Sequence, residues 1–371
     1  MKQKQQEFDF QNVVKNFTFA GEFLRADPYG NGHINDTFAA YFRKENGTVH
    51  RYILQRINHK VFQSPENLMK NISAVTGHLR DKITSAGGDF KRETLNLIPT
   101  VEGGSFYKSP DGNYWRGYIF IEHARTYDTV KDFQHFYHAG RAFGNFQKML
   151  SDFPAHTLYE TIPNFHNTVK RYENFLAAVE NDPLDRTRQV AAEIAFVKER
   201  KNDISLIVDL LKQGEIPLRV THNDTKFNNI MIDDQTGEGI CVIDLDTVMP
   251  GSTLYDFGDS IRFGASSALE DEKDLSKVEI KLDLYEEFTR GFLESARELI
   301  TPAELQYLAF SAKLMTFECG IRFLTDYLNG DIYFKIRREN HNLDRARNQF
   351  KLVKDMEEKQ AEMEAVADKY F

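Results

Sequence analysis

Residues 220–247 constrain the fold of this chain more than any other stretch. Their alternation of apolar runs and polar turns predicts a strand, a loop, a short strand, a turn and another strand. Three polar side chains stand at fixed offsets: Asp224, Asn229 five residues later, and Asp244 directly after the apolar run 240–243. Turn formation explains the Asn and Asp residue types but not these offsets. The stretch therefore predicts a chemical site.

The offsets fit phosphoryl transfer on a protein-kinase-like fold. In that chemistry one carboxylate accepts the proton of the attacking hydroxyl, while an Asn and a second carboxylate bind the Mg²⁺ that bridges the phosphates of ATP. We predict Asp224 as the base and Asn229 and Asp244 as metal ligands. Lys226 is expected to offset charge on the transferred group. Asp246 is expected to be a further metal ligand or a nearby acceptor.

Two neighbouring residues are predicted to support the loop, and a histidine distant in sequence either reaches a site or is structural. We expect His222 to brace it through hydrogen bonds. Asp256, near the start of a predicted helix, has a carboxylate that is able to accept backbone N–H bonds from the loop. His166, in a predicted loop over 160–168, is expected to be a structural histidine with satisfied hydrogen bonds.

Composition and charge exclude several classes of partner. The 371 residues include 28% charged side chains and carry a formal net charge of −9, with both signs spread along the chain. This argues against a nucleic-acid or membrane-surface partner, which favours a basic face. Cys241 and Cys319 lie in apolar contexts and are typical of reduced core residues. We expect a cytoplasmic protein that is a monomer or a weak oligomer.

The first third of the chain has strand and turn signals suited to a nucleotide. Gly30 and Gly32 permit a turn in which backbone N–H groups approach phosphate oxygens. His33, in the same turn, is expected either to serve the structure or to face the acceptor substrate. Residues 38–43 and 48–54 flank Asn46-Gly47, which predicts a type I′ hairpin.

The second strand of that hairpin departs from the kinase pattern. Where kinases carry a phosphate-pairing Lys, this chain has Gln55, followed by Arg56, and neither residue is favoured. Ser64-Pro65 opens a helix. Glu66 in its first turn is expected to be an ion-pair acid or an acid favoured by the helix dipole.

A further strand, 114–121, ends in Phe120-Ile-Glu-His123. In a kinase this segment is the hinge, whose backbone pairs with adenine. Phe120, Glu122 and His123 are therefore predicted nucleotide-binding residues. After residue 125 helical spacing dominates, including a long helix over 186–213, and 264–277 is expected to be a mobile surface loop. We therefore predict an α+β, bilobal protein-kinase-like fold, with an antiparallel-sheet N-lobe over 1–122 and a mainly helical C-lobe over 123–371.

Within the predicted C-lobe helix 302–330, one arginine stands among apolar residues. Arg322 lies between Ile321 and Phe323-Leu324, so it is expected to be partly buried and to need a partner. The partner is either an ion-pair acid or the hydroxyl groups of a ligand, which a guanidinium fork suits.

The chain resembles the aminoglycoside phosphotransferase and choline kinase superfamily, and within it the bacterial N-acetylhexosamine 1-kinases. The segments that carry the resemblance are Tyr29-Gly-Asn-Gly-His-Ile-Asn35, Arg51-Tyr-Ile-Leu-Gln55, Leu218-Arg-Val-Thr-His-Asn-Asp-Thr-Lys226, Ile243-Asp-Leu-Asp-Thr247, residues 255–266, Glu318-Cys-Gly-Ile-Arg-Phe-Leu324 and Gly330-Asp-Ile-Tyr333. They span nearly the whole chain. The catalytic motifs are typical of the superfamily, and the Gly-His-Ile-Asn and Cys-Gly-Ile-Arg segments are typical of the sugar kinases.

The resemblance implies ATP-dependent phosphorylation of the anomeric hydroxyl of N-acetylglucosamine or N-acetylgalactosamine. By motif position it places His33, Asn35 and Arg322 against the sugar, together with Asp224, and it adds Tyr333 as a wall of the site. Gln55 in place of a strand Lys matches these sugar kinases and departs from the wider superfamily.

Other acceptors remain open from the residues themselves. Choline or ethanolamine kinases need a site for a cation, which Arg322 opposes. Homoserine is a nearer rival, because an Arg suits a carboxylate. A nucleotide-binding pseudokinase is the alternative outside enzymes, although Asp224, Asn229 and Asp244 are all present.

Overall fold

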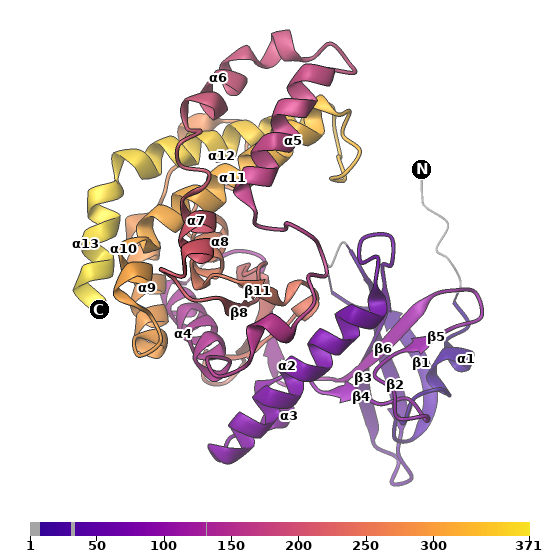
Figure 1. Ribbon diagram of the computed structural model, residues 1–371. Coiled ribbons are helices and arrows are strands. Elements are labelled where there is room, and N and C mark those ends of the chain that lie inside the picture. The colour runs from indigo at the N-terminus through magenta and orange to yellow at the C-terminus, as the bar shows by residue number, and fades with distance from the viewer. Residues whose placement is uncertain (1–7, 31–33, 131) are drawn as a thin grey trace. The chain divides into compact units, whose positions relative to one another are not determined.

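The computed structural model describes residues 8–30, 34–130 and 132–371. The chain divides into two compact units, Met1–Ala124 and Arg125–Phe371. The first contains an antiparallel sheet and the second is mainly helical, so the predicted fold class is confirmed (Figure 1).

The first unit is built on one antiparallel sheet. Its strands run in the order β1 (Glu22–Pro28), β2 (Asp36–Arg43), β3 (Val49–Ile57), β6 (Tyr114–Ile119) and β4 (Leu97–Ile98), and β5 (Tyr107–Lys108) also pairs with β6. Helix α1 (Phe10–Val14) and the sheet share an aromatic core, in which Phe42, Leu54 and Trp115 are buried. Side chains along β2 and β3 alternate between the two faces of the sheet. One face packs on this core, and side chains on the other face make different contacts.

The β2–β3 hairpin differs from the predicted type I′ turn. Gly47 has φ 82°, whereas Asn46 has a negative φ. The Gly47 amide donates to Lys44 O at 2.9 Å, and the Asn46 side chain accepts from the Thr48 amide at 3.1 Å. The turn is therefore of type I, with only its glycine left-handed, because Asn46 uses its side chain to cap the turn and not its capacity for positive φ.

Helix α2 (Pro65–Ser85) follows the predicted start at Ser64-Pro65, and the short helix α3 (Phe90–Glu93) comes after it. The apolar stripe of α2 is buried: Leu68, Ile72 and Val75 are fully enclosed. Glu66 accepts a hydrogen bond from Tyr114 Oη at 2.8 Å. Backbone N–H bonding in the first turn lowers the pKa of Glu66, and Tyr114 adds to this effect. Glu66 thus acts as a first-turn acid.

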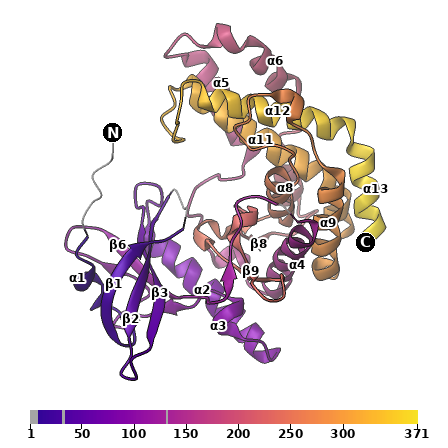
Figure 2. The same ribbon diagram turned by 180° about the vertical axis from the view of Figure 1, so that it is seen from behind.

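The second unit is a helical bundle with two small sheets, one of three strands and one of two. Its longer helices are α4 (Phe133–Met149), α5 (Thr168–Asn181), α8 (Thr253–Gly264), α9 (Leu282–Ala296), α11 (Leu308–Leu328), α12 (His341–Glu358) and α13 (Gln360–Tyr370). Helix α11 packs against α5, α8 and α12, as Figures 1 and 2 both show. Strands β9 (Ile230–Asp233) and β10 (Gly239–Val242) form one antiparallel pair, and β8 (Arg219–Thr221) and β11 (Met249–Gly251) form another.

Helices α4 and α9 approach closely through glycines. A Cβ on Gly140 would lie 2.3 Å from Phe288 O, and a Cβ on Gly291 would lie 2.1 Å from Tyr137 O. Both distances are shorter than any real contact between two such atoms. The two helices can therefore lie this close only because neither position carries a side chain. Gly140 and Gly291 thus permit the close packing of α4 and α9.

The predicted long helix over 186–213 is wrong. The structure has η2 (Thr187–Val190), α6 (Ala191–Glu199) and α7 (Leu206–Gln213), with turns between α6 and α7. Asn202 and Asp203 lie in that break, where such residues favour turns over helix. The predicted helix 302–330 is likewise divided into α10 (Pro302–Gln306) and α11.

The predicted surface loop 264–277 is anchored at several points. Glu270 pairs with Arg262 at 2.7 Å, and Asp271 contacts His341 Nε2 at 3.0 Å. Ser266 forms an isolated bridge with Ile280. Ion pairs and a strand bridge therefore hold this segment to the helices of its own unit. Among the described residues, no helix has the length and apolar character needed to cross a membrane.

Candidate active site

The loop after β8 carries the predicted base. Strand β8 pairs with β11, and the chain then passes through His222 and Asn223 to Asp224. Asn223 has φ 65°, a left-handed conformation that Asn tolerates better than most residues. Its side-chain amide donates to Thr247 O at 2.9 Å and its Oδ1 accepts from Thr221 Oγ1 at 3.0 Å. The side chain thus fixes the turn that presents Asp224.

Asp256, on α8, supports the same turn through hydrogen bonds. Its carboxylate accepts the backbone N–H of His222 at 2.9 Å and that of Asn223 at 2.7 Å, and Gln147 donates to it as well. Burial raises the pKa of Asp256, and these donors together with His222 partly offset that rise. The structure therefore places Asp256 in the supporting role expected from the sequence, while Thr225 Oγ1 donates to its backbone carbonyl at 2.6 Å.

Asp224 and Lys226 form an ion pair. The Lys226 Nζ lies 2.8 Å from Asp224 Oδ1, and the two side chains remain 35% and 26% exposed. Burial acts to raise the pKa of Asp224, but the charge and hydrogen bond of Lys226 outweigh it and hold this pKa below its ordinary value. The same carboxylate, with Asp259, raises the pKa of Lys226 against the opposing effect of burial. Asp224 is thus an ionised carboxylate with access to solvent.

The predicted metal ligands lie next to this pair. Asn229 Nδ2 donates to Asp224 O at 2.8 Å, which leaves its Oδ1 for another partner. The Ile243 amide donates to Asn229 O at 2.9 Å, so Asp244 follows directly after a contact with Asn229. Asp244 is exposed and has φ 59°. One amide oxygen and one exposed carboxylate suit Mg²⁺, which usually takes one or two carboxylates, water and phosphate oxygens.

Asp246 is placed differently from Asp244. It is buried, 3% exposed, in the short helix η4 (Leu245–Thr247), and its backbone carbonyl accepts from Thr161 Oγ1 at 3.1 Å. Within the described residues, no group of three His, Cys, Asp or Glu side chains is arranged to hold a metal by itself. The donor set therefore fits a metal that shares its coordination with phosphates and water, with Asp244 more accessible than Asp246.

Arg322, on α11, is a half-buried cation between aromatic rings. Its Cζ lies 5.2 Å from the Phe165 ring centre and 5.6 Å from that of Phe334. In the part of the chain that the structure describes, its guanidinium makes no hydrogen bond or ion pair. Burial acts to lower the pKa of Arg322, but Cys319 and other neighbours raise it. Of the two partners expected for this arginine, the ion-pair acid is absent from the described residues.

Tyr333 and the Phe165 backbone complete the surroundings of Arg322. Tyr333 is 62% exposed, and its ring lies 4.8 Å from that of Phe334. Arg171 donates to Phe165 O through Nε at 3.1 Å and Nη2 at 2.7 Å, which fixes the loop that carries this ring. Phe165 and Phe334 were not predicted, because two aromatic residues far apart in the chain carry no local signal for one guanidinium.

In the first unit, an aromatic pair borders the glycine turn. The ring of Tyr29 lies 5.3 Å from that of Phe120, and Arg51 Cζ lies over the Phe120 ring, 3.9 Å from its centre. Arg51 also pairs with Glu122. Glu122 and His123 are exposed, and His123 has φ 56°. These contacts place the predicted nucleotide-binding residues Phe120 and Glu122 together, around an arginine that the sequence analysis did not single out.

Two predicted residues of the glycine turn are described and two are not. Gly30 has φ 76°, which a side chain would strain. Asn35 Oδ1 accepts the backbone N–H of Asn58 at 2.9 Å, so this predicted sugar ligand has a structural bond within the sheet. Gly32 and His33 lie outside the described residues.

The register of the sheet shows the partners of Gln55 and Arg56, the two residues at the position of the kinase Lys. Gln55 on β3 lies opposite Arg116 on β6, and Arg116 Nε donates to Gln55 Oε1 at 3.0 Å. Arg56 faces the other side of the sheet, where its Nε bonds Asp36 at 2.7 Å. Arg116 is 1% exposed and was missed. The signal was present, since a charged residue inside the apolar strand Tyr114–Ile119 needs a partner.

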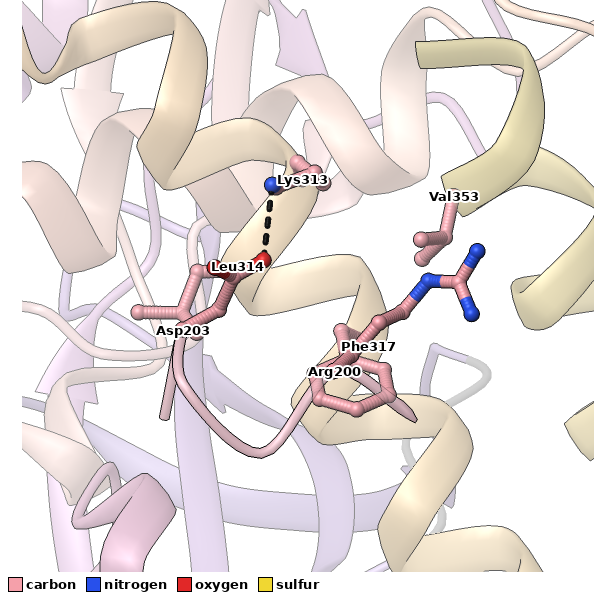
Figure 3. Close-up of a pocket in the computed structure, with 6 residues that line it drawn as sticks. All are labelled: Arg200, Asp203, Lys313, Leu314, Phe317 and Val353. Atoms are coloured by element: carbon pink, nitrogen blue, oxygen red, sulfur yellow. Dashed lines mark hydrogen bonds and ion pairs between the residues drawn. The ribbon is translucent and has the colours of Figure 1, made fainter. Parts of the chain in front are cut away.

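A notch elsewhere in the second unit is lined by cations that already have acidic partners. Figure 3 shows the residues that line it: Arg200, Asp203, Lys313, Leu314, Phe317 and Val353. Lys313 pairs with Asp203 at 2.8 Å, and Arg200 pairs with Glu357 at 2.8 Å. Both cations are therefore neutralised within the protein.

Solved structures share this fold at low sequence identity. A microcompartment-associated aminopropanol kinase matches with a TM-score of 0.60 and 13% identity, covering 95% of this chain and 97% of that one. An amicoumacin kinase, in complex with AMP-PNP, Ca²⁺ and Ami, matches with a TM-score of 0.55 and 16% identity, covering 95% of this chain and 94% of that one. A choline kinase from Cryptosporidium parvum matches with 0.53 and 15%, covering 91% and 90%. At such identities these structures establish the fold alone.

The sequence itself establishes the family. The model of the phosphotransferase enzyme family, APH, matches residues 28–276, which is more than half of the chain and includes the loop with Asp224, Asn229 and Asp244. The chain therefore belongs to the phosphotransferase enzyme family.

Proposed function

We propose that this protein transfers the γ-phosphoryl group of ATP to the anomeric hydroxyl of an N-acetylhexosamine and forms the sugar 1-phosphate. The observation that carries the choice of acceptor is the half-buried guanidinium of Arg322. It stands between two phenylalanines without a carboxylate partner among the described residues. A ligand with hydroxyl and amide oxygens suits five N–H donors arranged in a fork.

The charge of Arg322 disfavours cationic acceptors. Two like charges about 4 Å apart repel by about 4 kcal/mol at an effective dielectric constant near 20. Choline, ethanolamine, aminopropanol and aminoglycosides all carry such a charge. The structural relatives that act on choline and aminopropanol share the fold with this chain. A neutral sugar meets no such penalty, and the resemblance of the Cys-Gly-Ile-Arg segment to sugar kinases supports the same choice.

The proposed mechanism is an in-line transfer with Asp224 as the base. The lowered pKa of Asp224 keeps its carboxylate ionised and makes it a modest base. The anomeric hydroxyl is the most acidic hydroxyl of a reducing sugar, so orientation and late removal of its proton suffice. Lys226, 2.8 Å from Asp224, is close enough to offset charge on the transferred group.

Asn229 and Asp244 are the proposed ligands of Mg²⁺, which when bound neutralises charge on the β- and γ-phosphates. The amicoumacin kinase complex with AMP-PNP and Ca²⁺ supports nucleotide and divalent-metal use in this fold. In the first unit, the proposed nucleotide contacts are the Gly30 turn, with Gly32, and the segment from Phe120 to His123. His33, Asn35 and Tyr333 remain proposed sugar contacts.

Homoserine is the second candidate acceptor, since the same guanidinium suits a carboxylate bidentately. An acceptor panel separates the two. We would measure ADP release with N-acetylglucosamine, N-acetylgalactosamine, glucose, homoserine, choline and ethanolamine, and identify the product by ³¹P NMR. The expected result is turnover chiefly with the two N-acetylhexosamines and a phosphate on the anomeric oxygen.

Each other result has a defined meaning. Turnover of homoserine without turnover of either sugar would transfer the assignment to the second candidate. Turnover of choline or ethanolamine would contradict the role given to Arg322. Binding of ATP with no turnover of any acceptor would support a pseudokinase and overturn the proposed reaction.

A further inference from the structure

His166 lies in the second unit between α11 and the loop that carries Asp224. Its ring is buried, with Nδ1 2.8 Å from Glu318 Oε1 and Nε2 2.9 Å from Asn223 O. Glu318 is 1% exposed and also accepts from Thr168 Oγ1 at 2.6 Å. This histidine is thus satisfied, as expected from the sequence, but one of its partners is the carbonyl directly before Asp224.

The two contacts of His166 are a buried carboxylate and a backbone carbonyl, which are both hydrogen-bond acceptors. Nδ1 of His166 and Oε1 of Glu318 lie within ion-pair distance in a buried setting. Burial acts to raise the pKa of Glu318. The interactions with His166, Arg171 and Thr168 outweigh burial, so this pKa lies below its ordinary value. Tyr255, whose ring lies 5.3 Å from that of His166, is a further titratable group at this contact.

A second histidine holds the opposite side of the same peptide bond. The Asp224 N–H lies 3.3 Å from His222 Nδ1, and His222 Nε2 contacts Ile243 O at 2.8 Å. Because Nε2 donates to that carbonyl, Nδ1 is the acceptor for the Asp224 amide. The Asn223–Asp224 peptide is therefore bound at its N–H by one histidine and at its C=O by the other.

The peptide needs this support. Asn223 is left-handed, which costs an ordinary residue on the order of 1 kcal/mol and an Asn less. Without a donor at its carbonyl, the peptide plane is able to rotate toward a more common conformation, and Asp224 turns with it. A misplacement of about 1 Å at a reacting group lowers a rate by about a hundredfold.

We propose that His166 is a positioning residue that couples α11 to the base. Glu318 lies four residues before Arg322 on α11, so the helix that carries the acceptor contact also holds, through His166, the peptide that orients Asp224. The coupling to Asp224 follows from the geometry of the second unit, and its bearing on sugar phosphorylation rests on the proposed function.

Three substitutions separate the two bonds of His166. His166→Phe keeps a ring and removes both donors. His166→Gln extends an amide toward the position of Nε2 and is able to retain the bond to Asn223 O, whereas His166→Asn offers an amide only near Nδ1. We expect kcat to fall about 10- to 100-fold in His166→Phe and His166→Asn and to recover several-fold in His166→Gln, with the KM for ATP unchanged in all three.

His341 provides the matched control. It is also a buried histidine, with Nε2 at Asp271 and Nδ1 at the Arg337 amide, and it does not contact the Asp224 loop. His341→Gln is expected to lower the melting temperature while kcat stays within twofold of wild type. If His166 variants lose stability in the same way but keep wild-type kcat per folded molecule, His166 is merely structural and the proposal is overturned.

Two activities keep this test separate from that of the proposed function. ATP hydrolysis to water without an acceptor and phosphorylation of N-acetylglucosamine are measured in parallel. If the wild type hydrolyses ATP but phosphorylates no sugar, the proposed acceptor is wrong, and the order of the His166 variants in hydrolysis still decides the role of His166. Equal rates for His166→Gln and His166→Phe in both activities would overturn the assignment of the Asn223 contact. Absence of both activities from the wild type would contradict both proposals.

Discussion

The carboxylate of Asp326 accepts the backbone N–H of Tyr333 at 2.8 Å. It also accepts the amides of Ile332 at 3.1 Å and Phe334 at 2.9 Å. Asp326 is buried on α11, one turn after Arg322. Three consecutive amides on one carboxylate therefore fix the segment whose aromatic side chains border Arg322.

Asp326→Asn is expected to loosen that segment. The substitution removes a charge that receives hydrogen bonds worth about 1.5–3 kcal/mol each. We expect the KM for N-acetylglucosamine to rise about tenfold or more, with the KM for ATP within twofold of wild type, in steady-state kinetics. Asp274→Asn, which alters an exposed carboxylate bonded to the Ser276 amide, is the control. An unchanged sugar KM in Asp326→Asn would contradict this role.

Arg322→Gln should remove the cation from the acceptor side. We expect kcat/KM for N-acetylglucosamine to fall by about a hundredfold, which corresponds to about 3 kcal/mol, while ATP binding measured by calorimetry is retained. Arg200→Gln is matched, because Arg200 also stacks on a phenylalanine but pairs with Glu357. Its kcat/KM should stay near that of wild type. Equal losses in the two variants would show that the effect of Arg322 is one of stability.

Asp224→Asn should abolish proton acceptance without removing the side chain. General-base removal costs about 10²- to 10⁴-fold in rate, so we expect a kcat lower by at least a hundredfold in the ADP-release assay. The control is Asp234→Asn, which breaks the surface pair with Arg125. A near-full rate in Asp224→Asn would show that another group accepts the proton.

Asp244→Asn should raise the demand for Mg²⁺. Exchanging an exposed carboxylate for an amide weakens its attraction to a hard divalent cation. The Mg²⁺ concentration for half-maximal rate is expected to rise about tenfold or more, with little change in the sugar KM. Asp246→Asn provides the comparison: because Asp246 is buried, its variant should lose thermal stability and shift the Mg²⁺ demand less. The reverse order would make Asp246 the principal ligand.

Glu318 should make stability depend on acidity. Its folded-state pKa lies below the ordinary 4.5, so the folded state binds fewer protons there than the unfolded state. The stabilisation is therefore present above about pH 4.5 and lost as the pH falls through the folded-state pKa. The difference in melting temperature between wild type and Glu318→Gln should shrink from pH 7 toward pH 4. Glu199→Gln, at a mostly exposed carboxylate, should show no such trend.

Local patterns predicted the architecture because they depend on neighbours in sequence. The Ser64-Pro65 helix start, the buried stripe of α2 and the loop with Asp224 all follow from short spacings. The type of the hairpin turn did not follow, since Asn46 had two ways to serve it. The break near Asn202 was missed because an amphipathic charge pattern continues across it.

Long-range partners were beyond a single sequence. Glu318 and His166 are 152 residues apart, and Gln55 and Arg116 are 61 apart. Nothing within either segment specifies the other, and only the packing of α11 and the register of the sheet bring them together. Arg322 is a partial exception. A charge inside an apolar helix indicates that a partner is needed, although the sequence does not identify that partner.

Glu318, Arg322 and Asp326 recur at intervals of four along α11 and so lie along one stripe of the helix. One inserted or deleted residue between them would turn the following part of the helix by about 100°. Such a change would separate three features at once. These are the support of Asp224 through Glu318, the acceptor contact at Arg322, and the anchor of the 332–334 segment at Asp326. Relatives that keep this arrangement should therefore differ in α11 by substitution and hardly ever in length, and a change of acceptor by evolution or design should begin at Arg322 with the spacing of its two carboxylate neighbours retained.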